Sequence, residues 1–191
     1  MKKILGAPLL AAALVVTGFS AADAQNQLDR NQIVSSLAGT ARTVGRFDPI
    51  ALEKAAARAA ASGGEDATSQ LTNTLASLPQ LSVQINFDLN SGVIEPDSYY
   101  AVGLIADAMH TPSLSGQRFA VIGHTDASGP REFNFKLSQK RARAVAEALI
   151  TTFNVPVEEL IAIGLGEEQL QDPANPRSAV NRRVQIINIG Q

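Results

Sequence analysis

A carboxylate, an amide and a guanidinium stand close together in the middle of this 191-residue sequence, at Asp126, Asn134 and Arg141. The stretch that holds them begins as an apolar run, breaks at a Ser-Gly-Pro turn and resumes as a helical pattern. Helical spacing places Arg141 on the apolar stripe rather than on the solvated side. An inward-facing guanidinium needs an anionic partner, so the sequence predicts either a buried ion pair with Asp126 or a site for a ligand carboxylate.

Metal and catalytic sites in the same stretch lack the partners they need. His124 and Asp126, together with Asp88, can supply metal ligands, but the chain has only two histidines and no third strong ligand nearby. A triad of Ser128, His124 and Asp126 would crowd into one turn without a nucleophile elbow. We therefore expect a binding protein rather than an enzyme, with no metal and no cofactor.

The composition is that of an ordinary globular chain. Hydrophobic residues make up 45% of it and charged residues 18%, and the formal net charge is −2. A nucleic-acid partner would call for a basic surface, which an acidic chain does not indicate. We expect no nucleic-acid binding.

Residues 1–24 are typical of a secretory signal peptide. Two lysines precede an apolar run over residues 4–19, and Ala22-Asp23-Ala24 provides a small-x-small cleavage site. The apolar run is shorter than the ~20 residues that span a bilayer. The mature chain is expected to begin at Gln25 and not to span the membrane.

The chain contains no cysteine, which removes disulfides and a lipidated N-terminal cysteine together. No series of ~10-residue alternating strands precedes the C-terminal part, as a transmembrane barrel would require. We expect an exported periplasmic protein without barrel or lipid anchor, lying at most on the periphery of the outer membrane.

Residues 25–80 differ in composition from the rest of the chain. They are rich in alanine and serine, and alanine favours helix while burying little apolar area. We expect a tether with helical patches. Its apolar segment over residues 33–37 either docks a partner, such as another envelope protein, or packs back on the domain.

Residues 81–191 show the pattern of one α+β domain. Apolar periodicity predicts strands and helices in the order strand, helix, strand, helix, strand, long loop, strand. This order gives a two-layer α/β sandwich, with helices on one face of a mixed four-stranded sheet. The expected strands cover residues 81–89, 118–123, 160–165 and 183–189, the helices residues 96–109 and 138–153, and the loop residues 166–180.

An ordered set of short motifs over residues 82–189 resembles the signature of the OmpA-like C-terminal domain family. The motifs are Gly123-His124-Thr125-Asp126, Gly129, Asn134, Leu137-Ser138, Arg141-Ala142 and Asn181-Arg182-Arg183-Val184. Arg177 stands four residues before Asn181, where the family often has a Gly-Arg pair three residues before, so the register of the 166–180 loop departs from the pattern.

The resemblance implies non-covalent binding of peptidoglycan through the diaminopimelate of its peptide stem, in the envelope of a Gram-negative bacterium. In related domains, the residues that match Asp126 and Arg141 hold the ammonium and carboxylate of that group. The residues expected to line the rest of the pocket are Asp88, Thr125, Asn134 and Arg182.

Other interpretations of these residues stay open at the sequence level. Asp126 and Arg141 can form a purely structural salt bridge, Asn134 can serve a turn or cap, and Asp88 can simply end its strand. Of Arg182 and Arg183, one is expected to face the site. The functional alternative is a periplasmic protein–protein interaction module of the same fold, with weak or no wall binding.

Overall fold

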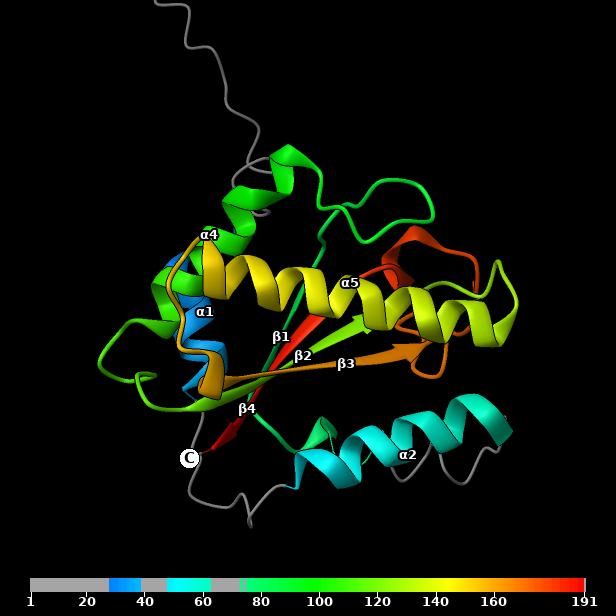
Figure 1. Cartoon of the computed structure of the whole chain (residues 1–191), viewed down its shortest axis with the longest axis horizontal. Coiled ribbons are helices and arrows are strands. Elements are labelled where there is room, and N and C mark those ends of the chain that lie inside the picture. Colours follow the sequence, from blue (N-terminus) through cyan, green and yellow to red (C-terminus); the bar gives the residue numbers. More distant parts are fainter. Residues whose placement is uncertain (1–27, 39–47, 63–72, 74, 191) are drawn as a thin grey trace, which may run out of the picture.

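The sheet holds four strands in the order β1-β4-β2-β3, in a computed structural model that describes residues 28–38, 48–62, 73 and 75–190 (Figure 1). Strand β4 runs antiparallel to β1 and β2, whereas β2 and β3 run parallel. The strands are β1 Gln80–Val83, β2 Arg118–His124, β3 Leu160–Gly166 and β4 Val184–Gly190. The expected α+β fold with a mixed four-stranded sheet is confirmed.

Two helices cover the first face of the sheet, α4 (Tyr99–Met109) and α5 (Arg131–Thr151). A third, α1 (Arg30–Leu37), packs beside α4 and β1. The core between them is continuous and apolar, because β2 turns alternate side chains to this face. Its fully buried large side chains include Ile33, Leu37, Ile105, Met109, Phe119, Leu149 and Ile186.

Helix α2 (Pro49–Ser62) covers the opposite face of the sheet, so helices lie on both faces rather than on one (Figure 1). The strands require this cover because β2, β3 and β4 are apolar at odd and even positions alike. Both faces of the sheet must therefore be buried away from solvent. Helix α2 contributes Leu52 and Ala56 to a cluster with Ala120, Ile122, Ile163, Leu165, Ile187 and Ile189.

The expected tether over residues 25–80 does not describe α1 and α2, which pack against the domain. Ile33, Leu37 and Ala56 are fully buried, and Leu52 is 4% exposed. Of the two alternatives for residues 33–37, the structure has the one in which they pack back on the domain. The signal-peptide residues lie outside the described part of the chain.

Two element boundaries differ from the sequence prediction by six residues or more, and both move site residues. Strand β1 ends at Val83, and beyond it Phe87 makes only an isolated bridge to Ile94. Helix α5 begins at Arg131 instead of Ser138, with Pro130 as its N-cap residue. Asn134 therefore lies in the first turn of the helix, and Arg141 lies about three turns in.

Helix α5 approaches the sheet unusually closely at two glycines. A Cβ atom at Gly164 would lie 2.4 Å from the Gln139 nitrogen, and one at Gly123 would lie 2.2 Å from the Ser138 carbonyl oxygen. The contact is closed by a hydrogen bond of 2.8 Å from the Gly166 amide to Ser138 Oγ. These contacts fix the distance between the helix that carries Arg141 and the strand that ends before Asp126.

Gly164→Ala is expected to lower the free energy of unfolding by about 1–3 kcal/mol, because backbone atoms of α5 have to move away from the added methyl group. Gly103→Ala is the matched control. There the added Cβ would first meet the ring of Phe153 at 3.1 Å, and a ring can adjust. Denaturant melts of both variants check the prediction, and equal midpoints would show that the close approach is unimportant.

Candidate functional site

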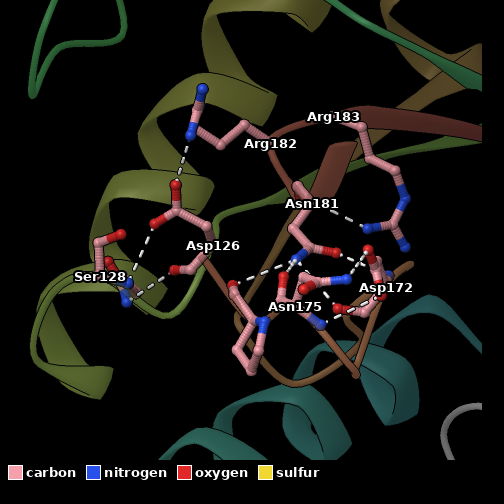
Figure 2. Close-up of polar contacts among 9 residues, drawn as sticks. Asp126, Ser128, Asp172, Asn175, Asn181, Arg182 and Arg183 are labelled. Atoms are coloured by element: carbon pink, nitrogen blue, oxygen red, sulfur yellow. Dashed lines mark hydrogen bonds and ion pairs between the residues drawn. The ribbon is translucent and has the colours of Figure 1, made fainter. Parts of the chain in front are cut away.

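Asp126 lies two residues beyond the end of β2 and forms an ion pair with Arg182, which lies just before β4 (Figure 2). Arg182 Nη1 donates to Asp126 Oδ2 at 2.6 Å, and the Ser128 amide donates to Oδ1 at 3.0 Å. Burial by itself would raise the pKa of Asp126, but the hydrogen bonds from Arg182 and Ser128 outweigh it and hold the pKa below its ordinary value. The carboxylate is therefore ionised at neutral pH.

Arg141 points to the same place from α5 but has no carboxylate partner among the described residues. Its Nε donates to the Ser91 carbonyl oxygen at 3.0 Å, and its guanidinium lies 4.9 Å from the centre of the Phe87 ring. The residue is only 9% exposed. Burial and the charge of Arg182 lower the pKa of Arg141, and Asp126 opposes this shift. The salt bridge that the sequence allowed between Asp126 and Arg141 is replaced by the pair with Arg182.

Asn134 ties the turn after β2 to the first turn of α5. Its amide nitrogen donates to the carbonyl oxygens of Asp126 and Gly129, both at 3.1 Å, and to Glu167 Oε2 at 2.5 Å. Thr125 is 3% exposed, and its hydroxyl has no hydrogen-bond partner within the part of the chain that the structure describes. Asn134 thus positions the site, while the Thr125 hydroxyl beside it is buried and unpaired within the described residues.

These groups line one pocket of about 450 Å³. Two guanidinium groups and one carboxylate face it, and apolar side chains complete its wall. The lining residues are Phe87, Leu89, Asn90, Thr125, Asp126, Ser128, Gly129, Phe133, Asn134, Leu137, Arg141 and Arg182. Five of the six residues that the sequence indicated for the site therefore lie together.

Asp88 is the exception, and it does not line the pocket. The residue is exposed, and its backbone closes the turn over residues 88–93 through hydrogen bonds with Val93 and Ser91, both at 3.0 Å. Its neighbours Phe87 and Leu89 line the pocket instead. The sequence analysis missed them because it continued the strand through this turn.

Arg183 points away from the site. Its Nη2 donates to the Gln169 carbonyl oxygen at 3.0 Å, and burial lowers its pKa to about 10. Arg182 is thus the member of the pair that faces the pocket, as expected for one of the two.

His124 is fully buried and hydrogen-bonded to Gln185 at 3.1 Å. Burial, with the charge of Arg183, lowers its pKa to about 3 against the effect of that hydrogen bond, so the ring is neutral.

Among the described residues, no three His, Cys, Asp or Glu side chains cluster as a metal site would require. Nor does any helix there have the length and apolar character to cross a membrane.

Comparison with known proteins identifies the domain. The OmpA family model matches residues 86–183. The chain is 35% identical over 113 residues to outer membrane porin F of Pseudomonas fluorescens, covering 58% of this chain and 34% of the porin. It is 32% identical over 101 residues to the peptidoglycan-associated lipoprotein of Pseudomonas aeruginosa, covering 52% of this chain and 58% of the lipoprotein.

A solved structure is also similar, that of the peptidoglycan-associated lipoprotein from Burkholderia pseudomallei, with 30% identity and a TM-score of 0.45 over 56% of this chain and 87% of that chain. This chain spans only about a third to just over half of the length of the curated relatives it matches. The family match covers half of the chain and includes every residue that lines the pocket. The chain therefore belongs to the OmpA family, a family of peptidoglycan-binding domains that are not enzymes.

Proposed function

We propose that this chain binds peptidoglycan non-covalently through the diaminopimelate of the peptide stem, in the envelope of a Gram-negative bacterium. The observation that carries the proposal is Arg141, a nearly buried guanidinium that lines the pocket without a carboxylate partner among the described residues. A buried cation of this kind is normally paired. A ligand carboxylate would complete it.

The charges of the pocket fit a zwitterion. The Nε of Arg141 is already bonded to Ser91, which leaves the two terminal nitrogens to grip a carboxylate side by side. Asp126 accepts one hydrogen bond on each oxygen, and a carboxylate has about four acceptor positions in all. An ammonium group can therefore approach Asp126 without displacing Arg182. The free end of diaminopimelate carries both groups on one carbon atom.

The relatives support the cellular setting of this proposal. Porin F is an outer membrane protein, and the peptidoglycan-associated lipoproteins are named for their wall partner. We place this chain in the periplasm, exported by the signal peptide over residues 1–24 and at most peripheral to the outer membrane. Contacts with other envelope proteins through residues 25–80 would use side chains other than Ile33 and Leu37, since both are buried.

The proposal is tested by sedimentation of the purified protein with insoluble peptidoglycan that contains diaminopimelate. The competitor is the stem tripeptide L-Ala-γ-D-Glu-diaminopimelate, and its control is the same tripeptide with lysine in the third position. Lysine keeps the terminal ammonium but lacks the carboxylate beside it. We expect the diaminopimelate peptide to release the protein at concentrations at which the lysine peptide does not.

Sedimentation that neither peptide affects would contradict the proposed ligand. A protein that stays in the supernatant would favour the alternative, a protein-contact module of the same fold. Release of soluble muropeptides during the assay would contradict a purely binding role.

A further inference from the structure

The long loop between β3 and β4 is organised around one buried amide, that of Asn181. The residue is fully buried and lies in the short 3-10 helix η4 (Ala179–Asn181). Its Nδ2 donates to the carbonyl oxygens of Asn175 and Pro176, both at 3.1 Å, and to that of Asp172 at 3.4 Å. Its Oδ1 accepts from the Asp172 amide at 2.9 Å, so the side chain makes contacts on both of its ends (Figure 2).

The Pro176 carbonyl connects this amide to the candidate site. The same oxygen accepts a hydrogen bond from Asn181 Nδ2 and another, at 3.0 Å, from the amide of Ala127. Ala127 directly follows Asp126 in the turn after β2. A carbonyl oxygen has two lone pairs and can accept both bonds. Asn181 therefore holds the acceptor that fixes the backbone beside Asp126.

Asn181 also sets the direction of the other partner in the ion pair. Arg182 follows it, and the Arg182 amide closes the 3-10 turn by donating to the Ala179 carbonyl oxygen at 3.0 Å. From this fixed backbone the Arg182 side chain points to Asp126, whereas that of Arg183 points to the other side of the loop (Figure 2). The buried Asn181 side chain thus contacts the carbonyl that holds the turn after Asp126 and anchors the residue next to Arg182.

We propose that Asn181 is a positioning residue for the wall-binding pocket, which holds the turn after Asp126 and the backbone of Arg182 so that the two charged groups meet. The importance of this for wall binding rests on the proposed function, whereas the positioning itself does not. The long loop over residues 166–180 then connects the turn after Asp126 to the backbone of Arg182 and holds them in place.

The test compares Asn181→Ala with Asn175→Ala, a change in the same loop. The Asn175 side chain is exposed and, among the described residues, bonds only to the Asp172 carboxylate, at 2.9 Å. The readout is the pH titration of the Asp126 carboxyl group, followed by carbon NMR in the full chain. The pKa of Asp126 is expected to rise toward its ordinary value of 3.8 in Asn181→Ala, because the bond from Arg182 is lost, and to stay low in Asn175→Ala.

A loss of stability alone would leave the Asp126 pKa of the folded protein where it is, so this readout separates positioning from simple packing. If Asn181→Ala does not fold at the temperature of the measurement, Asn181→Ser replaces it, since a hydroxyl can keep one of the contacts but cannot span all of them. An unchanged Asp126 pKa in whichever of the two variants folds would overturn the proposal.

Wall sedimentation of the same variants completes the test. We expect Asn181→Ala to bind peptidoglycan roughly 10-fold more weakly, which is the low end of the range seen when a residue that supports a ligand-contacting residue is removed. Asn175→Ala is expected to bind like the wild type. A shifted Asp126 pKa in a protein that never bound the wall would keep the positioning role and reject the proposed function. Wild-type binding by Asn181→Ala, with the Asp126 pKa unchanged, would reject the positioning role of Asn181 and keep the proposed function.

Discussion

Arg141→Ala is expected to remove most of the wall binding, at a cost of about 2–5 kcal/mol of binding free energy, because the ligand carboxylate is left desolvated and unpaired. The side chain has no carboxylate partner among the described residues, so the change leaves no protein anion buried without its counter-charge. The same loss is expected with the diaminopimelate tripeptide in solution.

The folded state should tolerate this change better than the binding does. Arg141→Ala removes one hydrogen bond to Ser91 and the contact with the Phe87 ring, together about 1–3 kcal/mol of stability. Arg143→Ala is the matched control, because Arg143 is exposed on the same helix and lies outside the pocket. Thermal melts and sedimentation of both variants measure the two quantities together. Normal sedimentation of a folded Arg141→Ala protein would exclude the site.

The sequence was sufficient to predict a mixed four-stranded sheet, the helix that follows Pro96, the later turns of the helix that carries Arg141, and the neighbourhood of Asp126 and Arg141. These features are local. Alternating or helical periodicity marks each strand and helix, and the site residues from Thr125 to Arg141 lie within one strand–turn–helix unit. The start of α5 was less accessible. Phe133, Asn134 and Leu137 in its first two turns line the pocket, and Phe133 stays 44% exposed, so the apolar stripe begins late.

The pairing of charges could not be predicted from local pattern. The sequence analysis considered a pair of Asp126 with Arg141, fifteen residues away, but not with Arg182, which lies fifty-six residues away. Which of them bonds to Asp126 is decided by the path of the loop before β4, and that path depends on the buried contacts of Asn181. Sequence spacing carries no information on such a long-range arrangement, so the pair could not be predicted.

The packing of helix α2 against the sheet was missed for a different reason. Its alanines predict helix but give little indication of burial, since each covers little area. The informative signal lay in the strands that it covers. The sequence of β3 is Leu-Ile-Ala-Ile-Gly-Leu-Gly. It is apolar at odd and even positions alike, which indicates a sheet covered on both faces. Taken together with that signal, the alanine-rich segment over residues 49–62 is the natural cover.

Asp126→Asn is expected to weaken wall binding by about 2–5 kcal/mol as well, because the ligand ammonium loses its counter-charge in a pocket that keeps two guanidinium groups. The asparagine has nearly the same shape and can still accept from the Ser128 amide. Stability should change modestly, because the Asp126 side chain is 11% exposed but that of Arg182 is 46% exposed and stays hydrated, and exposed ion pairs contribute about 0.2–1 kcal/mol. Glu132→Gln, which removes an exposed carboxylate from the first turn of α5, is the matched control.

The two stem tripeptides turn these variants into an assignment of the ligand charges. Both peptides carry the terminal ammonium, so Asp126→Asn should weaken the binding of each by a similar factor. Only the diaminopimelate peptide carries the adjacent carboxylate, so Arg141→Ala should weaken that peptide alone and remove the preference for it. Calorimetric titration of each variant with each peptide gives the coupling energies directly.

The pH dependence supplies an independent check on the same assignment. Because the pKa of Asp126 is lowered in the folded protein, its contribution to binding should be fully present above the ordinary value of 3.8 and disappear as the pH falls through the lowered pKa. The difference in affinity between wild type and Asp126→Asn isolates this contribution from the titration of the ligand. A difference that vanishes already near neutral pH, or an Asp126→Asn effect confined to the diaminopimelate peptide, would mean that Asp126 does not hold the ammonium.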